Sequence, residues 1–338
     1  MADPAIQTFC CFNPGKRAKP ALLALTEFNS SNYNTVCLVS SFIGMVGAIY
    51  QILHKKDYMH KHRLVSLMCG RGRKIILWLA FADLLASLGV FVRSIVKLND
   101  NFVNRMDESN STFLFCMIFS VWTQYFYCVT WMWTLCYTVD MCLAVQDRPS
   151  HSTLYHLFCW LLPAVLTAGG LTLLYYPNPS CIDPTSQGLV DRILPNYFAT
   201  YLPVLVVMLA NPLLYWHVAK HLHRVIWTGV GQWTNKERTI VESVHRTFAL
   251  VNVLFYICWL PNLVSAVLVW IWPMPDLGIV VTLWYVMAIV NPLQAAFNCL
   301  IYSDFSSKMN VPWYPVDHPP IETTPLLSTN NSSDEGPS

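Results

Sequence analysis

Charged residues are scarce in this chain of 338 residues. Asp, Glu, Lys and Arg make up 12% of it, about half of the roughly 25% that is usual in soluble domains, while hydrophobic residues make up 54%. The net charge of +2 is too small to indicate a nucleic-acid partner. The few charges are clustered between long apolar segments, which excludes an ordinary soluble domain and indicates a polytopic membrane protein.

Other familiar signatures are missing too. Residues 1–12 have no basic start followed by an apolar core, so we expect no cleavable signal peptide and expect the first span to direct insertion. No Cys-x-x-Cys pair with metal-ligand spacing and no nucleophile motif occurs, so we expect neither an enzyme nor a cofactor. Seven of the twelve cysteines are expected to be apolar packing residues: Cys37, Cys128, Cys136, Cys142, Cys159, Cys258 and Cys299.

Seven apolar segments are each long enough for the about 20 residues that cross a bilayer as a helix. None alternates apolar and polar residues as a barrel strand does. The sequence therefore predicts an all-α membrane protein, a bundle of seven transmembrane helices at 35–305, between an N-terminal arm at 1–34 and a disordered tail at 306–338. The expected spans are about 35–53, 75–97, 113–140, 155–176, 195–219, 247–271 and 277–303.

The distribution of basic residues predicts an orientation. Segments 54–74 and 220–246 carry seven and five Lys or Arg, and their side of the membrane carries fourteen in all, against five on the other. Because basic segments stay in the cytosol, we expect a lumenal or extracellular N-terminus and a cytosolic tail. Two glycosylation sequons, at Asn29 and Asn110, then fall on the outer side, as glycosylation requires.

Two charges lie deep in the second span. Asp83 is near its middle, where a carboxylate costs roughly 2.5–3.5 kcal/mol, so it should face the interior, with Asn291 of span seven as partner. The pair either fixes helix packing or forms a water or sodium cluster that rearranges on activation. Arg93, nearly three turns further on, binds either an outer-loop carboxylate, Asp183 or Asp191, or the carboxylate of a ligand.

Prolines interrupt three of the spans. Pro261 follows Trp259 by two residues in span six, and Asn-Pro pairs occur at Pro212 in span five and Pro292 in span seven. A proline removes a backbone hydrogen bond and bends a membrane helix. Such bends are ordinary in membrane helices, but the three together are typical of hinges for switching.

The seven spans, with Cys116 at the outer end of span three and Cys181 in the second outer loop, resemble G-protein-coupled receptors. Several stretches are distinctive: L-L-Y-Y-P before Cys181, P-N-Y-F-A-T-Y-L-P-V-L-V-V-M-L-A-N-P-L-L at 195–214, C-Y-T-V-D, T-N-K-E-R, C-W-L-P-N and V-N-P-L-Q-A-A-F. With these stretches, the chain resembles the ocular albinism type 1 family from residue 8 to the end of span seven. The resemblance implies a disulfide between the two cysteines, which face an oxidising compartment.

The resemblance implies a receptor of melanosomes, late endosomes or lysosomes, partly at the plasma membrane, that couples to heterotrimeric G proteins and regulates melanosome biogenesis. It also implies the ligand L-DOPA, with tyrosine and dopamine competing. We expect Arg93 to take the ligand carboxylate, and an aromatic side chain to face its ring. Thr123 stands where amine receptors usually carry an aspartate, so amino acids should be preferred over amines. The expected ligand-binding residues are Arg93, Thr123, Tyr127, Trp259, Asn262 and Tyr285.

The chain also departs from the rhodopsin-like pattern. Span three ends in Asp140-Met141-Cys142 where Asp-Arg-Tyr is usual, so the arginine that locks the inactive state is missing. Ala295 stands where a tyrosine is usual after the Asn-Pro pair. These departures leave the switching mechanism open. The expected switching residues are Asp83, Asn291, Pro292, Asp140 and Pro261.

The tail carries a sorting signal in a segment that cannot build a core. Glu322, three further residues and the pair Leu326-Leu327 form the acidic dileucine pattern that clathrin adaptor complexes bind in the cytosol. Such a signal directs a receptor to endolysosomal or melanosomal membranes.

Three rival interpretations remain to be compared. A retinal protein needs a lysine in span seven, and 277–303 contains none. A seven-span lysosomal transporter stays possible, although no internal repeat and no proline-glutamine pair is visible. The last span, N-P-L-Q-A-A-F-N-C-L-I-Y, also resembles the cyclic-AMP receptors.

Overall fold

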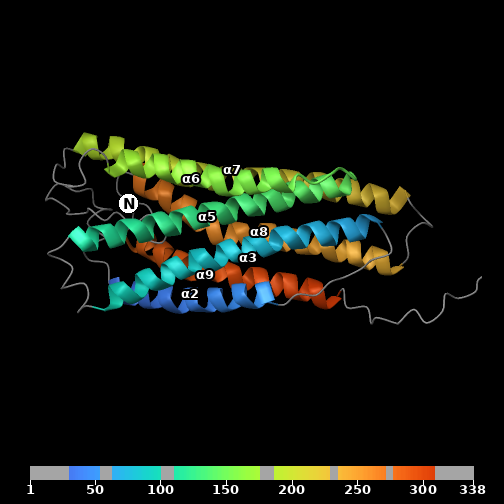
Figure 1. Cartoon of the computed structure of the whole chain (residues 1–338), viewed down its shortest axis with the longest axis horizontal. Helices are drawn as coiled ribbons and strands as arrows, with labels where there is room; N and C mark the ends of the chain where they lie inside the picture. Colours follow the sequence, from blue (N-terminus) through green and yellow to red (C-terminus); the bar gives the residue numbers. More distant parts are fainter. Residues whose placement is uncertain are drawn as a thin grey trace, which may run out of the picture.

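In the described part of the chain, the computed structural model has seven long α-helices that lie side by side (Figure 1). Each contains an apolar stretch of 22 to 29 residues, long enough to cross a membrane, which confirms the expected seven-helix bundle. The structure describes residues 30–53, 63–99, 110–175, 186–228, 235–271 and 277–308. The helices are α2 (Ser30–Leu53), α3 (Arg63–Leu98), α5 (Asn110–Val145), α6 (Ser152–Tyr175), α7 (Ser186–Thr228), α8 (Asn235–Ile271) and α9 (Leu277–Lys308).

Successive helices run in opposite directions, so the bundle has two ends (Figure 1). We call the end where α2 begins the N end and the end where α9 finishes the C end. Helices α2, α5, α7 and α9 run from the N end to the C end, and α3, α6 and α8 return.

Helix α5 is the centre of the bundle. Of its apolar stretch 83% is buried, against 22% in α6, and it packs against α3, α6 and α7. A helix that is apolar all round has no solvent face and is stable only when surrounded. The outer helices expose aliphatic side chains such as Val165 on α6 and Leu213 on α7, as expected of surfaces that meet lipid.

Helices α2 and α9 approach each other closely through small residues. A Cβ on Gly44 would collide with the carbonyl oxygen of Pro292, and one on Gly47 would lie 2.5 Å from the Cα of Ala296. Only glycine permits this spacing, because helices in a membrane associate by close backbone packing rather than by a hydrophobic driving force.

The seven cysteines expected in apolar segments are all buried and free, which confirms their role as packing residues. The thiol of Cys159 on α6 lies 3.3 Å from the sulfur of Cys136, so the two side chains meet at the contact between α6 and α5.

Candidate functional site

Asp83 is buried in the bundle, as expected, but its hydrogen-bond partner differs from the expected one. The Nδ2 of Asn298 on α9 donates to its carboxylate over 3.0 Å. The expected partner, Asn291, is buried two helical turns earlier, and neither its amide oxygen nor its amide nitrogen has a partner among the described residues. The expected Asp83–Asn291 pair is therefore wrong. The observed partner lies two turns further along the same face of α9, because residues seven apart share one face of a helix.

The shift to Asn298 brings a tyrosine into the site that the sequence interpretation missed. Tyr302, one turn further along α9, is buried, and its ring packs edge-on against Tyr137 of α5 at 6.2 Å between centroids. Counted from Asn291, the position where a tyrosine is usual holds Ala295. The stretch from Asn298 to Tyr302 carries an asparagine and a tyrosine four residues apart, which was the available signal.

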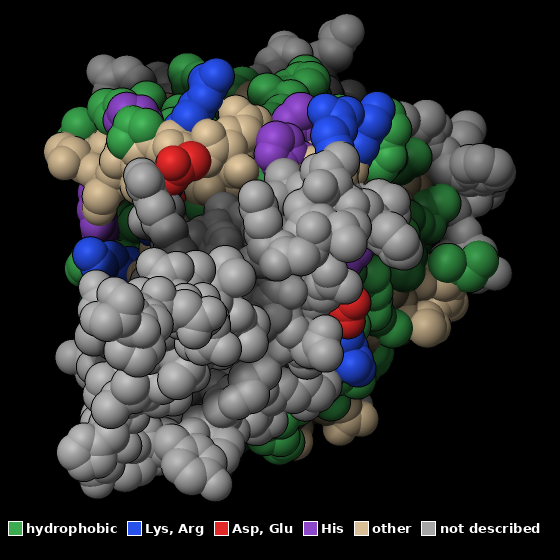
Figure 2. Space-filling model, turned by 90° about the vertical axis from the view of Figure 1, so that its right-hand side faces the viewer, with side chains coloured by type: hydrophobic (Ala, Val, Ile, Leu, Met, Phe, Trp, Pro, Cys, Tyr) green, Lys and Arg blue, Asp and Glu red, His purple; other side chains and the backbone are tan. Residues whose placement is uncertain are grey.

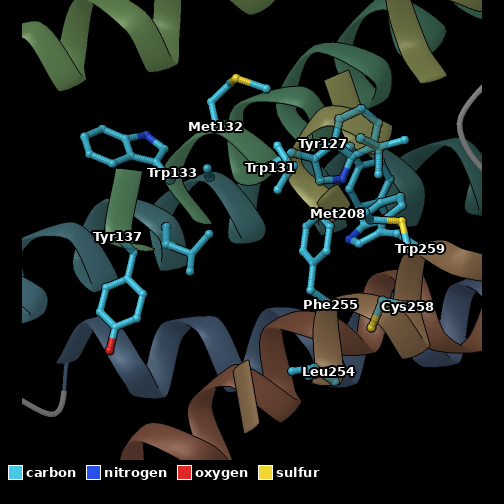
Figure 3. Close-up of a cluster of buried hydrophobic side chains, with 14 of the residues drawn as sticks. Tyr127, Trp131, Met132, Trp133, Tyr137, Met208, Leu254, Phe255, Cys258 and Trp259 are labelled. Atoms are coloured by element: carbon cyan, nitrogen blue, oxygen red, sulfur yellow. The ribbon is translucent and has the colours of Figure 1, made fainter. Parts of the chain in front are cut away.

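Trp259 on α8 is fully buried and joins three helices (Figure 3). Its ring packs edge-on against Tyr127 at 5.1 Å and Trp131 at 4.8 Å, both on α5. Its indole Nε1 donates to the Oε1 of Gln294 on α9 over 2.7 Å. Because Trp259 lies two residues before Pro261 and Gln294 two after Pro292, this contact links the proline-containing turns of α8 and α9.

The remaining expected ligand residues lie on different helices. Thr123 on α5 is buried, and a Cβ on Gly89 of α3 would lie 3.1 Å from its hydroxyl oxygen, so Thr123 faces α3. Asn262 on α8 is also buried. Tyr285 on α9 packs edge-on against Tyr33 of α2 at 6.0 Å. The structure thus brings Tyr127 and Trp259 into contact and places Tyr285 on the α2 side of α9.

Arg93 is 3% exposed, so it lies in the bundle interior, near the last residues of α3 and towards the N end of the bundle. Lys97, one turn further, is exposed. The outer-loop carboxylates expected as alternative partners fall outside the description, since Asp183 is not described and the side chain of Asp191 is not either. Burial of an arginine requires a polar or anionic environment.

A polar cluster next to Thr123 was not expected from the sequence. The Nε2 of Gln124 on α5 donates to the Oδ1 of Asn196 over 3.0 Å and to the hydroxyl of Thr200 over 2.8 Å, both on α7. All three side chains are buried. Gln124 lies within the aromatic run W-T-Q-Y-F-Y, so the sequence pattern indicated aromatic packing rather than a polar cluster.

The C end contains the Asp140-Met141 pair, where the sequence departs from the usual Asp-Arg. Asp140 is fully buried and accepts a hydrogen bond from the hydroxyl of Tyr155 on α6 over 3.1 Å, and Met141 is buried beside it. Tyr215 on α7 and His245 on α8 are hydrogen-bonded over 3.0 Å. The arginine that is usual at this end is missing from the sequence. The Asp140–Tyr155 and Tyr215–His245 hydrogen bonds join the helices there instead.

Basic and histidine side chains surround the described part of the C end, with fewer acidic ones (Figure 2). The Nη1 of Arg71, in the third turn of α3, donates to the carbonyl of Arg148 over 2.6 Å, which joins α3 to the connection between α5 and α6. The other Lys and Arg with described side chains here are Arg73, Lys74, Lys220, Arg224 and Arg246, and the exposed acids are Asp147 and Glu242.

Several expected sites lie outside the described residues. They are Asn29, Cys181 and the sorting residues Glu322, Leu326 and Leu327. Asn110 begins α5 and Cys116 lies in its second turn, but the side chains of both are not described.

Comparison with known proteins identifies the family. Residues 1–313 match the family model described as ocular albinism type 1 protein. The chain is 30% identical over 319 residues to the human protein named G-protein coupled receptor 143, covering 89% of this chain and 77% of that one. The fold is similar to squid rhodopsin, with a TM-score of 0.55 at 14% identity over 89% of this chain and 91% of that one. The chain therefore belongs to the ocular albinism type 1 protein family, whose matched member is a receptor rather than an enzyme.

Proposed function

We propose that the chain is a G-protein-coupled receptor of intracellular membranes that senses a tyrosine-derived amino acid such as L-DOPA. The observation that carries the proposal is the contact of Trp259 with Tyr127 and Trp131 on α5 and with Gln294 on α9. This contact joins two proline-bent helices to the buried centre of the bundle. A ligand that displaces one ring there changes the packing of three helices together, which is what a switch requires.

The C end of the bundle faces the cytosol in this proposal. The excess of exposed Lys and Arg at that end supports it, because basic segments are retained on the cytosolic side. The heterotrimeric G protein then binds at the C end, against 220–246 and the region of Asp140 and Arg148. The ligand enters from the N end, which faces the organelle lumen.

Arg93 supplies the charge that selects the ligand. Its guanidinium is buried on the ligand side and matches a carboxylate in bidentate geometry. Thr123 offers no negative charge to an ammonium group. Its hydroxyl oxygen has no hydrogen-bond partner among the described residues. Tyr127 shields the fully buried Trp259 and is the first ring that a catechol meets. The proposed site therefore favours an amino acid over the corresponding amine.

The organelle follows from the family and from the tail. The matched family is named for ocular albinism, which indicates pigment cells and melanosomes. Glu322, Leu326 and Leu327 supply the signal by which clathrin adaptors carry the receptor to melanosomes or lysosomes, with some reaching the plasma membrane. Regulation of organelle size and number is the expected output.

Ligand binding tests the proposed specificity. We expect the purified receptor to bind radiolabelled L-DOPA with a higher affinity than dopamine shows as a competitor, because only L-DOPA carries the carboxylate. Arg93→Ala should weaken L-DOPA roughly 10- to 100-fold, the value of a charged hydrogen bond, and leave dopamine unchanged. Lys97→Ala, which removes the neighbouring cation one turn away, is the matched control and should weaken L-DOPA binding less than Arg93→Ala does. Tighter binding of dopamine than of L-DOPA would contradict the proposal.

A further inference from the structure

Six prolines lie inside the described helices, and at two of them a neighbouring helix supplies a replacement donor for the opened carbonyl. A proline has no N–H, so the carbonyl four residues earlier loses its hydrogen bond. For Pro212 in α7 this is the carbonyl of Met208, and for Pro292 in α9 it is the carbonyl of Ala288. In a membrane no water from the lipid core can replace the donor, so another part of the protein must supply one.

A hydroxyl from a neighbouring helix reaches each of these two carbonyls. The hydroxyl of Tyr256 on α8 donates to the Met208 carbonyl over 2.5 Å. The hydroxyl of Ser40 on α2 donates to the Ala288 carbonyl over 2.7 Å, a shorter distance than the 3.1 Å to the Cys37 carbonyl of its own helix. The two donors come from helices far apart in the sequence from the prolines that they serve, so the contacts depend on the tertiary fold.

The helix packing brings each donor to its carbonyl. On α2, Gly44 follows Ser40 by one turn and lies against the Pro292 carbonyl, where any Cβ would collide. The α2 backbone can therefore approach the bend of α9 closely enough for the short serine side chain to reach it. On α8, Tyr256 precedes Trp259 by three residues, so its longer side chain extends from the same part of the helix as the central tryptophan.

We propose that Tyr256 and Ser40 are latches that hold the bends of α7 and α9. Each hydroxyl satisfies a carbonyl that a proline has opened, so moving α8 away from α7, or α2 away from α9, leaves a buried acceptor without a donor. The bend and its neighbour therefore move together, or the movement is penalised. Tyr256 and Ser40 are positioning residues in this account, and they need no contact with a ligand.

A double-mutant cycle tests the latches by thermal unfolding of the purified receptor without ligand or G protein, so the result does not depend on the proposed function. Tyr256→Phe removes only the hydroxyl and should lower Tm by roughly 2–4 °C, the shift for losing one buried hydrogen bond. Pro212→Ala restores a backbone N–H at position 212, which can donate to the Met208 carbonyl. In that background, Tyr256→Phe should lower Tm by no more than half as much. Ser40→Ala with Pro292→Ala should behave in the same way.

Tyr197→Phe is the matched control. Its hydroxyl also bonds a carbonyl across helices, that of Ala266 over 3.3 Å, but Trp270 lies within α8 and keeps its helical N–H for that carbonyl. Its loss should cost less than the loss of the Tyr256 hydroxyl. The proposal is overturned if Tyr256→Phe and Ser40→Ala lower Tm equally with and without their prolines, or if Tyr197→Phe lowers it as much as they do.

Discussion

Asp83 and Trp259 each hold one polar side chain of α9, and together they fix that helix in the bundle. Asn298 donates to Asp83 from one turn of α9, and Gln294 accepts from Trp259 one turn earlier. Each contact is buried and therefore stronger than it would be in water. A movement of α9 must either break both contacts or move Asp83 and Trp259 together with the helix. These two side chains therefore restrain the position of the whole helix.

Replacing Asn298 tests the corrected partner of Asp83. Asn298→Ala leaves a buried carboxyl oxygen without its donor and should destabilise the receptor by about 1–3 kcal/mol. Asn291→Ala is the matched control and should cost less, because its amide makes no hydrogen bond among the described residues. The seven buried cysteines make unfolding measurable with a thiol-reactive dye in detergent. A larger loss for Asn291→Ala would restore the original pairing.

The sequence could predict that Asp83 is buried but not which asparagine meets it. The cost of a carboxylate in lipid rises with its depth, which can be counted from the ends of a span. Its partner depends on how far α3 and α9 slide along each other, which side-chain packing decides. Asn291 and Asn298 share one face of α9, so helical periodicity could not distinguish them.

Helices α2 and α9 meet in a contact that depends on individual small residues. Gly44 and Gly47 lie against Pro292 and Ala296, where additional side-chain atoms have no room. The close approach also allows Ser40 to reach the carbonyl opened by Pro292. Helix α5 is the opposite case, because large aromatic side chains fill the space between it and its neighbours.

A methyl group added at Gly44 tests this close packing. Gly44→Ala places a Cβ against a backbone oxygen that cannot move aside, so it should destabilise the receptor by about 1–3 kcal/mol, as overpacking does. Gly169→Ala on α6 adds the same methyl group where nothing lies within 4 Å. It should leave stability unchanged or raise it by up to about 1 kcal/mol, because alanine favours a helix. Equal unfolding temperatures for the two variants would contradict the packing account.

Span number and position could be predicted because apolar length alone decides whether a helix crosses a membrane. The central place of α5 could not. Its aromatic residues occur on every side, so no single face indicates a direction, and lipid and protein interior are equally apolar. The Gln124 cluster with Asn196 and Thr200 was missed for the same reason, since its partners are set by the contact of α5 with α7.

As a whole molecule, the bundle combines a buried polar and aromatic centre with two different ends. Arg93 lies towards the N end, and exposed basic side chains gather at the C end (Figure 2). Trp259, Gln294 and the bends of α8 and α9 lie between them. This arrangement suits a protein that receives a ligand on one side of a membrane and binds a partner on the other, which is the central claim.

The most direct test is dissociation of G-protein subunits, measured by energy transfer in living cells during titration with L-DOPA. The Leu326→Ala/Leu327→Ala receptor is used so that it accumulates at the cell surface, as checked by surface biotinylation. We predict a saturable response that Arg93→Ala abolishes and Lys97→Ala leaves intact. A flat response from receptor shown to be at the surface would contradict the claim that this chain is an L-DOPA receptor.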